Sequence, residues 1–384
     1  MSMDVAPILR LFRQDLSVLN LGLAGFAESL LANGAEAVQL AWKPPAGGDP
    51  AMLEALDRIG AGADGANRRA AGIILEGRPV LVGLGTALDV VPGMTPATIL
   101  HAGPPIAWER MGEPLRAAVS AGLNREGLCG EVRFEPCHRH QAVAPAAGVI
   151  TAGTPVWIVA DAVRGHRAFC AVDAEPGLAR VLDLALRARG PVDLKELLAQ
   201  ALRMGDEGRE RNRAAASLFI RALAPAMVRL DQPRDLLAGA LAFLDASDGF
   251  FLNLSMAACK CILDPARTVA GSTVVVAMAC NGTDFGIQVA GLGDRWFTAP
   301  AAEGPSDAAI TEAAGLGAFC LSTGRMRQIT AAEDPVWGIP AGIDLRKVVE
   351  TGILPAIGTG LKPPGSCFRE ALAAFADLPA EKGQ

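Results

Sequence analysis

The pattern of apolar and polar positions at the start of the chain predicts a β-α-β unit. A short apolar run at 18–22 ends in glycine, apolar residues at helical spacing follow at 26–31, and a second strand-like run occupies 37–41. Two continuously apolar runs, at 72–75 and 80–84, predict further strands that are buried on both faces. The first hundred residues are therefore expected to alternate between strand and helix.

A long helical region is predicted in the middle of the chain. Asp193 and Glu196 have the spacing of a capping box, in which two side chains bind the backbone at the start of a helix. Apolar residues then recur at helical spacing through 207–223, 236–244 and 250–262. Strand-like runs flank this region at 149–150, 156–160, 168–172, 273–278 and 285–290.

These patterns predict a mixed α/β, multidomain protein. We expect a Rossmann-like N-terminal α/β part, α+β parts and an internal all-helical domain. The expected boundaries are 1–100 for the N-terminal α/β domain, 101–185 for an α+β domain, 186–265 for the helical domain and 266–384 for a C-terminal α+β domain. A length of 384 residues with 51% hydrophobic residues suits two or three folding units, each with its own core.

Composition narrows the classes of ligand. The 41 acidic residues outnumber the 35 basic ones, which argues against general binding to nucleic acid or to an anionic membrane. No signal peptide or membrane-spanning run is recognisable, and the eight cysteines lack regular spacing, so we expect a cytoplasmic protein with buried thiols. The chain has no tyrosine, which leaves histidines, carboxylates and thiols for acid–base chemistry.

Two polar segments punctuated by glycine or proline are candidate parts of a binding site. The first, HAGPPIAWERM at 101–111, carries His101, Trp108, Glu109 and Arg110 on a backbone made rigid by two prolines. The second contains Asn281 and Asp284 between two predicted strands, with Arg295 following shortly after. Loops of this kind carry binding and catalytic residues more often than element interiors do.

A cluster of cysteines and histidines lies at 129–140. If residues 137–140 are extended, His138 and His140 point to the same side, which suits two ligands or an anion clamp. Structural histidines, a substrate role and a metal site with Cys129 and Cys137 all remain open, although the spacing does not match a structural zinc finger. We expect no metal. Cys259 and Cys261 lie two apart in a helical pattern and are predicted to be core thiols.

The densest charged stretch opens the longest predicted helix. It contains Asp206 and Glu207, followed by Arg211, Asn212 and Arg213. Acidic residues are common in the first turn of a helix, but Arg211, Asn212 and Arg213 could donate paired hydrogen bonds to a carboxylate or a phosphate. Gly83 and Gly85 form only half of a dinucleotide fingerprint, so we expect no cofactor.

Several ordered blocks together resemble one bacterial family. They are HAGPPIAWERM (101–111), F-x-P-x-H-x-H-x-AV (134–143), MGDE-x-x-x-RN (204–212), FFLNLSMAACK (250–260), NGTDFGI (281–287), RWFTAP (295–300) and GIDLRKVVETGI (342–353). This set resembles the YlbE-like family and spans nearly the whole chain. After MGDE, this chain has Arg209 and Glu210 where the family usually has histidine and asparagine.

The resemblance implies a subunit of an oxamate carbamoyltransferase-type complex in allantoin catabolism, encoded beside an FdrA-like partner subunit. The reaction would exchange a carbamoyl group between phosphate and the nitrogen of oxamate. The expected substrates are small anions such as oxamate, oxalurate or carbamoyl phosphate, and a homo-oligomer is expected.

The same hypothesis assigns roles to the candidate residues. His101, His138 and His140 are candidate bases or oxyanion donors, because imidazole titrates near neutral pH. The remaining candidates would bind or orient the substrate; they are Trp108, Glu109, Arg110, Asp206, Glu207, Arg211, Asn212, Arg213, Asn281, Asp284 and Arg295. Two alternatives remain: a catalytically decayed or scaffold subunit of an FdrA-type complex, and a metal-dependent amidohydrolase that uses residues 129–140.

Overall fold

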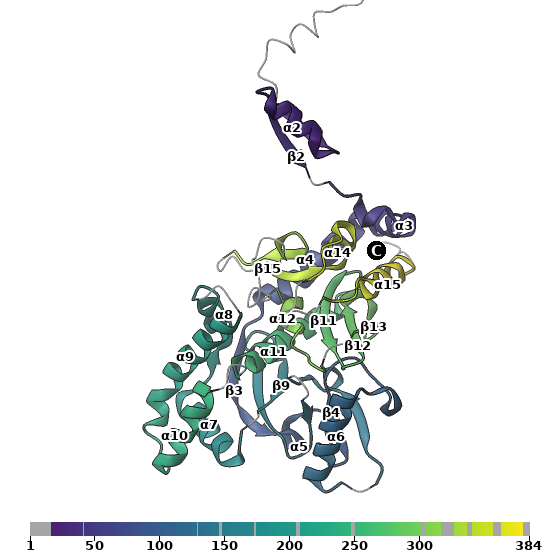
Figure 1. Cartoon of the computed structure of the whole chain (residues 1–384). Helices are drawn as coiled ribbons and strands as arrows, with labels where there is room; N and C mark the ends of the chain where they lie inside the picture. The colour runs from purple at the N-terminus through teal and green to yellow at the C-terminus, as the bar shows by residue number, and fades with distance from the viewer. Residues whose placement is uncertain are drawn as a thin grey trace, which may run out of the picture. The chain divides into compact units, whose positions relative to one another are not determined.

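The structure is a computed structural model with two compact units, Met1–Asp49 and Pro50–Gln384. It describes residues 17–40, 42–128, 130–145, 148–172, 174–204, 208–246, 250–301, 304–315, 326–335, 340–355 and 362–378. The predicted mixed α/β class is confirmed, with several sheets and many helices (Figure 1). The four predicted domain boundaries stay a prediction. Within the described ranges, no helix is long and apolar enough to span a membrane.

The smaller unit contains the predicted β-α-β element. Strand β1 (Ser17–Leu21) pairs in parallel with β2 (Glu36–Leu40), and helix α2 (Ala24–Ala32) connects them. Many apolar side chains of this unit face solvent; Leu19, Leu23, Phe26 and Trp42 are each more than 60% exposed. A two-stranded sheet of this kind buries little apolar surface by itself.

In the larger unit, a five-stranded sheet has the strand order β10-β3-β8-β9-β6. Its neighbours are antiparallel except for the parallel pair of β6 and β9. The strands are β3 (Pro79–Thr86), β6 (Ala142–Val143), β8 (Pro155–Asp161), β9 (Arg167–Ala171) and β10 (Val192–Asp193).

The strand predicted at 72–75 is wrong, because these residues belong to helix α4 (Asp64–Glu76). Ala66, Ala70 and Ile74 of α4 are all buried and lie four residues apart. The apolar run is therefore part of the buried face of a helix, which a short apolar run by itself cannot distinguish from a strand.

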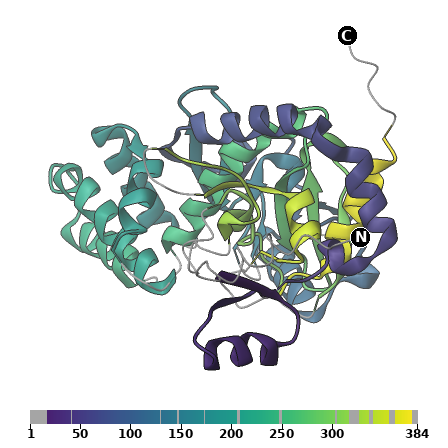
Figure 2. The same cartoon turned by 90° about the horizontal axis from the view of Figure 1, so that it is seen from above.

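The predicted helical region is present between the sheets and along one side of the larger unit. Its helices are α7 (Pro176–Arg189), α8 (Leu194–Ala201), α9 (Gly208–Met227), α10 (Arg234–Ala246) and α11 (Phe250–Leu263). The Asp193 carboxylate accepts a hydrogen bond from the backbone N–H of Glu196 at 3.1 Å, which is the predicted helix cap. Figures 1 and 2 show α7 to α10 grouped on one side, whereas the largely buried α11 packs against β8 and β9.

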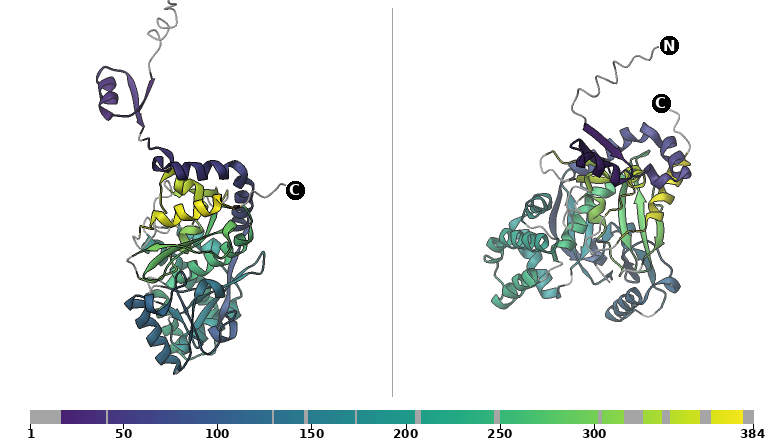
Figure 3. Two further views of the ribbon diagram at one scale, coloured as in Figure 1. Left: turned by 90° about the vertical axis from the view of Figure 1, so that its right-hand side faces the viewer. Right: turned by 45° about the horizontal axis from the view of Figure 1, so that its top comes forward.

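A second five-stranded sheet, β13-β12-β11-β15-β14, is antiparallel throughout. Its strands are β11 (Val274–Cys280), β12 (Asp284–Val289), β13 (Phe297–Pro300), β14 (Thr330–Glu333) and β15 (Pro340–Asp344). Figure 3 shows α14 (Leu345–Thr351) and α15 (Gly365–Ala376) beside α3 (Pro50–Ile59) at one end of this unit. The short helix α12 (Ile310–Ala313) packs against β11 and β15 of this sheet.

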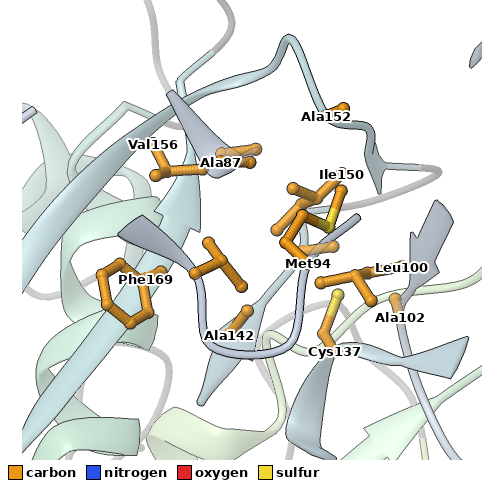
Figure 4. Packing of buried hydrophobic residues seen from close by; sticks show 13 residues of the cluster. Ala87, Met94, Leu100, Ala102, Cys137, Ala142, Ile150, Ala152, Val156 and Phe169 are labelled. Carbon is orange, nitrogen blue, oxygen red and sulfur yellow. The ribbon is translucent and has the colours of Figure 1, made fainter. Parts of the chain in front are cut away.

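A third, three-stranded sheet positions the candidate site. Strand β4 (Thr98–His101) lies between β5 (Arg133–Pro136) and β7 (Val149–Ile150), and α6 (Glu113–Glu126) packs against it. A buried apolar cluster joins this sheet to α5 (Ala87–Val90), β6 and β8 (Figure 4). The short 3-10 helices are η1 (Pro45–Gly48), η2 (Gly60–Ala63), η3 (Trp108–Arg110), η4 (Cys137–His140), η5 (Asp264–Thr268) and η6 (Ala290–Leu292).

Candidate functional site

His101 is the last residue of β4, and its imidazole is buried. The neighbouring Leu100 and Ala102 belong to the apolar cluster of Figure 4, so the core fixes the backbone on both sides of the histidine. The ring Nδ1 lies 2.9 Å from the carbonyl oxygen of Ala102, to which it must donate. Burial lowers the pKa of His101, and its Nε2 has no hydrogen-bond partner among the described residues.

His138 lies in η4, directly after the core residue Cys137. Its Nε2 donates to the carboxylate of Asp307 at 3.2 Å, which leaves the lone pair on Nδ1. Burial and, after it, the positive charge of Lys260 lower the pKa of His138. The ring is therefore held as a neutral imidazole whose Nδ1 can accept a proton. This Nδ1 also lacks a partner within the described part of the chain.

The expectation that His138 and His140 share one side of an extended segment is wrong, because residues 137–140 form the 3-10 helix η4. The turn directs His140 elsewhere. Its Nδ1 lies 2.7 Å from the carbonyl oxygen of Pro92, and its Nε2 lies 2.9 Å from the carboxylate of Glu135. The hydrogen bond from His140 lowers the pKa of Glu135. Both ring nitrogens of His140 are thus already engaged.

Asp307 connects the segments around these histidines and was not singled out from the sequence. Its fully buried carboxylate accepts hydrogen bonds from the backbone N–H groups of Gly103 and Ala144, both at 2.8 Å, as well as from His138. A carboxylate with three donors orients the imidazole that it contacts. The only sequence signal is an aspartate shortly before a short helix, which is too common to identify the residue.

The two predicted polar segments meet in the structure. Arg110 pairs with the carboxylate of Asp284 at 2.8 Å, and the Asn281 side chain donates to the carbonyl of Pro104 at 3.1 Å. Gly103, with φ +84°, lies so close to the second segment that a Cβ there would be 2.4 Å from the backbone nitrogen of Asn281. The structure therefore brings the two candidate segments, 101–111 and 281–284, into direct contact.

Further residues beside these two segments lie on one face of β12. Asp284, Gly286 and Gln288 alternate along the strand and share a face. A Cβ at Gly286 would meet the Pro104 side chain at 2.5 Å and the indole of Trp296 at 2.9 Å, so glycine leaves room for both. Trp296 in turn lies edge-on to His138, with ring centroids 5.2 Å apart.

A cavity of about 640 Å³ lies next to His138 and Trp296. This volume is in the range of small-molecule sites. Its wall has three basic groups besides His138, contributed by Arg139, His166 and Arg267, together with the carboxylate of Asp264; the other lining residues are Pro105, Gln141, Gln288, Asp294 and Trp296. The cavity thus unites residues from η4, η5, β12 and the loop after it.

Asp264 is the most strongly paired carboxylate at this cavity. It accepts hydrogen bonds from Lys260 at 2.7 Å, from Arg267 at 2.9 Å and from His166 at 3.3 Å. Burial alone would raise the pKa of Asp264, but these three partners outweigh it and hold the pKa well below its usual value. Lys260 is fully buried, and its ammonium also donates to the carbonyl of His138. Lys260 is a second residue that sequence reasoning missed.

Three predicted site residues lie on the surface nearby. Trp108 stacks on Phe134 with centroids 5.4 Å apart, and the side chain of the adjacent Glu109 is exposed. The exposed guanidinium of Arg295 lies 4.5 Å from the centroid of the Phe297 ring.

The charged stretch at 205–213 is not brought to this cavity by any contact among the described residues. Asp206 and Glu207 lie outside the described residues. Arg211, Asn212 and Arg213 are in the first turns of α9, which packs against α7, α8, α10 and α11. The side-chain amide of Asn212 donates to the carbonyl of Gly208, within the same helix.

Neither a metal site nor a nucleotide loop is found in the described ranges. No group of three His, Cys, Asp or Glu side chains there could hold a metal ion, and Cys129 lies outside them. Gly83 and Gly85 are inside the antiparallel strand β3, where Cβ atoms would meet Asp183 and Val90. Cys259 and Cys261 are core thiols, as predicted, and burial raises the pKa of both.

Comparison with known proteins places the chain among carbamoyltransferase subunits. Residues 132–181 and 174–314 match the family model described as oxamate carbamoyltransferase subunit AllG. The chain is similar to the oxamate carbamoyltransferase subunit AllG of Escherichia coli (strain K12), with 33% identity in an alignment 374 positions long, which covers 73% of this chain and 89% of AllG.

Two further relatives cover most of the chain. The uncharacterized protein YahG of Escherichia coli (strain K12) is 34% identical in an alignment 466 positions long, which covers 96% of this chain and 98% of YahG. The crystal structure of a conserved protein of unknown function from Enterococcus faecalis V583 superimposes with a TM-score of 0.75 and 34% identity, covering 82% of this chain and 97% of that chain.

Proposed function

Because the chain belongs to the family of the oxamate carbamoyltransferase subunit AllG, we propose that it acts in carbamoyl transfer between phosphate and a small amide anion. The transfer would occur at the cavity beside His138. AllG is named as a subunit, so the proposal includes a partner subunit, of the FdrA-like type implied by the sequence resemblance. A cytoplasmic homo-oligomer that serves allantoin catabolism is part of the same proposal.

The observation that carries this proposal is the pair formed by His138 and Asp307. The Asp307 carboxylate fixes which nitrogen of the imidazole bears the proton, and the ring is part of a cavity wall. Burial and Lys260 keep the ring neutral near pH 7. A neutral imidazole in a fixed tautomer is the form that a general base requires.

Carbamoyl transfer requires the transfer of one proton between the attacking and the departing group. When carbamoyl phosphate forms from oxalurate, a phosphate oxygen attacks the carbamoyl carbon and the bond from that carbon to the oxamate nitrogen breaks. His138 Nδ1 accepts the proton of the attacking phosphate and returns it to the departing nitrogen. In the reverse direction, Nδ1 accepts the proton that the oxamate nitrogen loses as it attacks, and phosphate departs with that proton.

The cations at the cavity supply the charge stabilisation that this step needs. Phosphate and the two product anions are negatively charged, and Arg139 and Arg267 line the cavity. Arg110, held by Asp284, is a candidate for the carboxylate end of the substrate. In the proposal, His101 stays a neutral imidazole near Asp307, and His140 maintains the turn of η4 through its two hydrogen bonds.

The proposal is tested by the phosphate-dependent release of carbamoyl phosphate from oxalurate. The full chain is assayed with and without the FdrA-like subunit encoded beside it. His138→Gln keeps an N–H near the position of Nε2 but removes the base, so we expect a loss of about 100-fold or more in kcat. His166→Gln is the matched control, because His166 lines the same cavity and bonds Asp264 through Nε2; a loss of less than about tenfold is expected there.

Two results would contradict the proposal. One is the absence of turnover with folded protein in both assays, which would favour a scaffold subunit. The other is an equal loss in the two histidine variants.

A further inference from the structure

Three residues that line the cavity each hold a buried polar atom without a hydrogen-bond partner among the described residues. The atoms are Nε of Arg267, Oε1 of Gln288 and Nδ1 of His138. His138 and Gln288 are only 4% and 2% exposed, so bulk solvent hardly reaches these side chains. Buried polar atoms are nearly always paired, and an unpaired one costs free energy. Three in the wall of one cavity indicate a ligand that provides the missing partners.

The other hydrogen bonds of these side chains define what each free atom can do. The amide nitrogen of Gln288 donates to the carbonyl of Asp294 at 2.9 Å, so Oε1 is an acceptor. His138 donates through Nε2 to Asp307, so Nδ1 is a second acceptor. The two Nη groups of Arg267 bind Asp264 and Asp294, both at 2.9 Å, which leaves its Nε–H as a donor.

Two acceptors and one donor complement a primary amide, which has two N–H donors and one carbonyl acceptor. We propose that Gln288, together with His138 and Arg267, selects the H₂N–C=O end of the substrate at this cavity. The inference rests on the proposed function and identifies Gln288 and Arg267 as specificity-determining residues for it. Neither residue was a candidate in the sequence.

The arrangement discriminates against a carboxylate of the same shape. A carboxylate would place oxygen lone pairs against Oε1 of Gln288 and Nδ1 of His138, and neither atom could form a hydrogen bond with it. Sites built to bind an N–H reject analogues that lack it, because their own buried polar groups then stay unpaired. The three atoms are covered by their neighbours in this structure, so small side-chain rotations accompany binding.

Oxamate and oxalate are suitable probes, because they differ only in an amide that replaces one carboxylate. Their affinities for the full chain are measured by calorimetry, without any turnover, in the presence of the partner subunit if the chain alone binds neither. We expect oxamate to bind at least tenfold more tightly than oxalate, which corresponds to one unpaired buried group.

The variant Gln288→Met removes the acceptor and keeps the length of the side chain. It is expected to weaken oxamate binding about tenfold and to leave oxalate binding unchanged or stronger. Gln232→Met makes the same chemical change on the surface, where the Gln232 side chain donates to the carbonyl of its neighbour Asp231, and should have no effect. Arg267→Lys removes the Nε–H and keeps the positive charge, so it provides a second loss of oxamate preference if Gln288→Met does not fold.

The outcomes separate this inference from the proposed function. Equal affinities of wild type for oxamate and oxalate, or an oxamate preference that survives both Gln288→Met and Arg267→Lys, would overturn the inference even if carbamoyl transfer is observed. A clear amide preference that both variants abolish, combined with no carbamoyl transfer, would support the inference and overturn the proposed function.

Discussion

His101 and His138 are two imidazoles that the fold keeps uncharged, because burial lowers the pKa of both. Each donates one N–H to a fixed oxygen, which is the carbonyl of Ala102 for His101 and the carboxylate of Asp307 for His138. Each keeps the other nitrogen as an acceptor. His138 also lines the cavity, and the lowered pKa values of the two histidines make stability depend on pH.

The direction of this pH dependence follows from proton binding. Below pH of about 6.5, the unfolded chain binds protons on both histidines that the folded chain does not bind. The free energy of unfolding should therefore fall as the pH decreases from 7 to 5, by at most about 1.4 kcal/mol per pH unit for each histidine. In His101→Asn, the new amide can still donate to Ala102, but the group no longer titrates, so this slope should be reduced by about half. Urea unfolding at several pH values measures it, and an identical slope in the variant would refute the interpretation.

At the scale of elements, the site depends on the approach of two loops from different sheets. The loop after β4 and the turn before β12 are held together by the contacts of Gly103, Arg110 and Asn281. Asp307 binds the backbone of Gly103 from a third segment. The loops position the cavity wall, so a small displacement there would separate His138 from the face of β12.

Gly103 and Gly127 offer a matched test of this approach. Both have positive φ, but a Cβ at Gly103 would lie 2.4 Å from Asn281, whereas nothing lies within 4 Å of one at Gly127. Gly127→Ala should cost about 1–2 kcal/mol for backbone conformation alone. Gly103→Ala should cost at least about 2 kcal/mol more, because the loops must separate. Urea denaturation of both variants provides the comparison, and similar losses would show that the close approach is unimportant.

At the scale of the whole molecule, the chain combines a large unit with extensive cores and a small unit with little core. Eight of the fifteen large apolar side chains that are exposed in the described residues belong to residues 19–42. In its described residues, the small unit consists of the parallel pair β1 and β2, one nine-residue helix and the short 3-10 helix η1. Such an element is marginally stable in water by itself.

Native-state hydrogen exchange should reveal this difference. Amides of β1 and β2 should exchange through local opening, with protection at least about 100-fold lower than in the central strand β11, whose residues are all buried. A chain that begins at Pro50 should keep the protection of β11 and the same unfolding midpoint. Equal protection in β1 and β11, or a large loss of stability on truncation, would contradict the division into two independent units.

Periodicity in the sequence was sufficient to predict the β-α-β start, the Asp193 cap and the helices of the middle region, because these depend on neighbours a few residues apart. It was misleading at 72–75, where an apolar run too short to show a period belongs to α4. Local spacing also failed at 137–140, where η4 turns His140 away from His138.

The sequence by itself therefore determined the elements, the mixed α/β class and the segments that carry the polar residues. Only the tertiary structure decided which of those residues meet. Asp307 binds Gly103 across 204 positions of sequence, and the cavity unites His138 with Arg267 and Gln288 from other elements. Such contacts depend on how sheets and loops pack together, and the spacing of side chains along the sequence does not determine that packing.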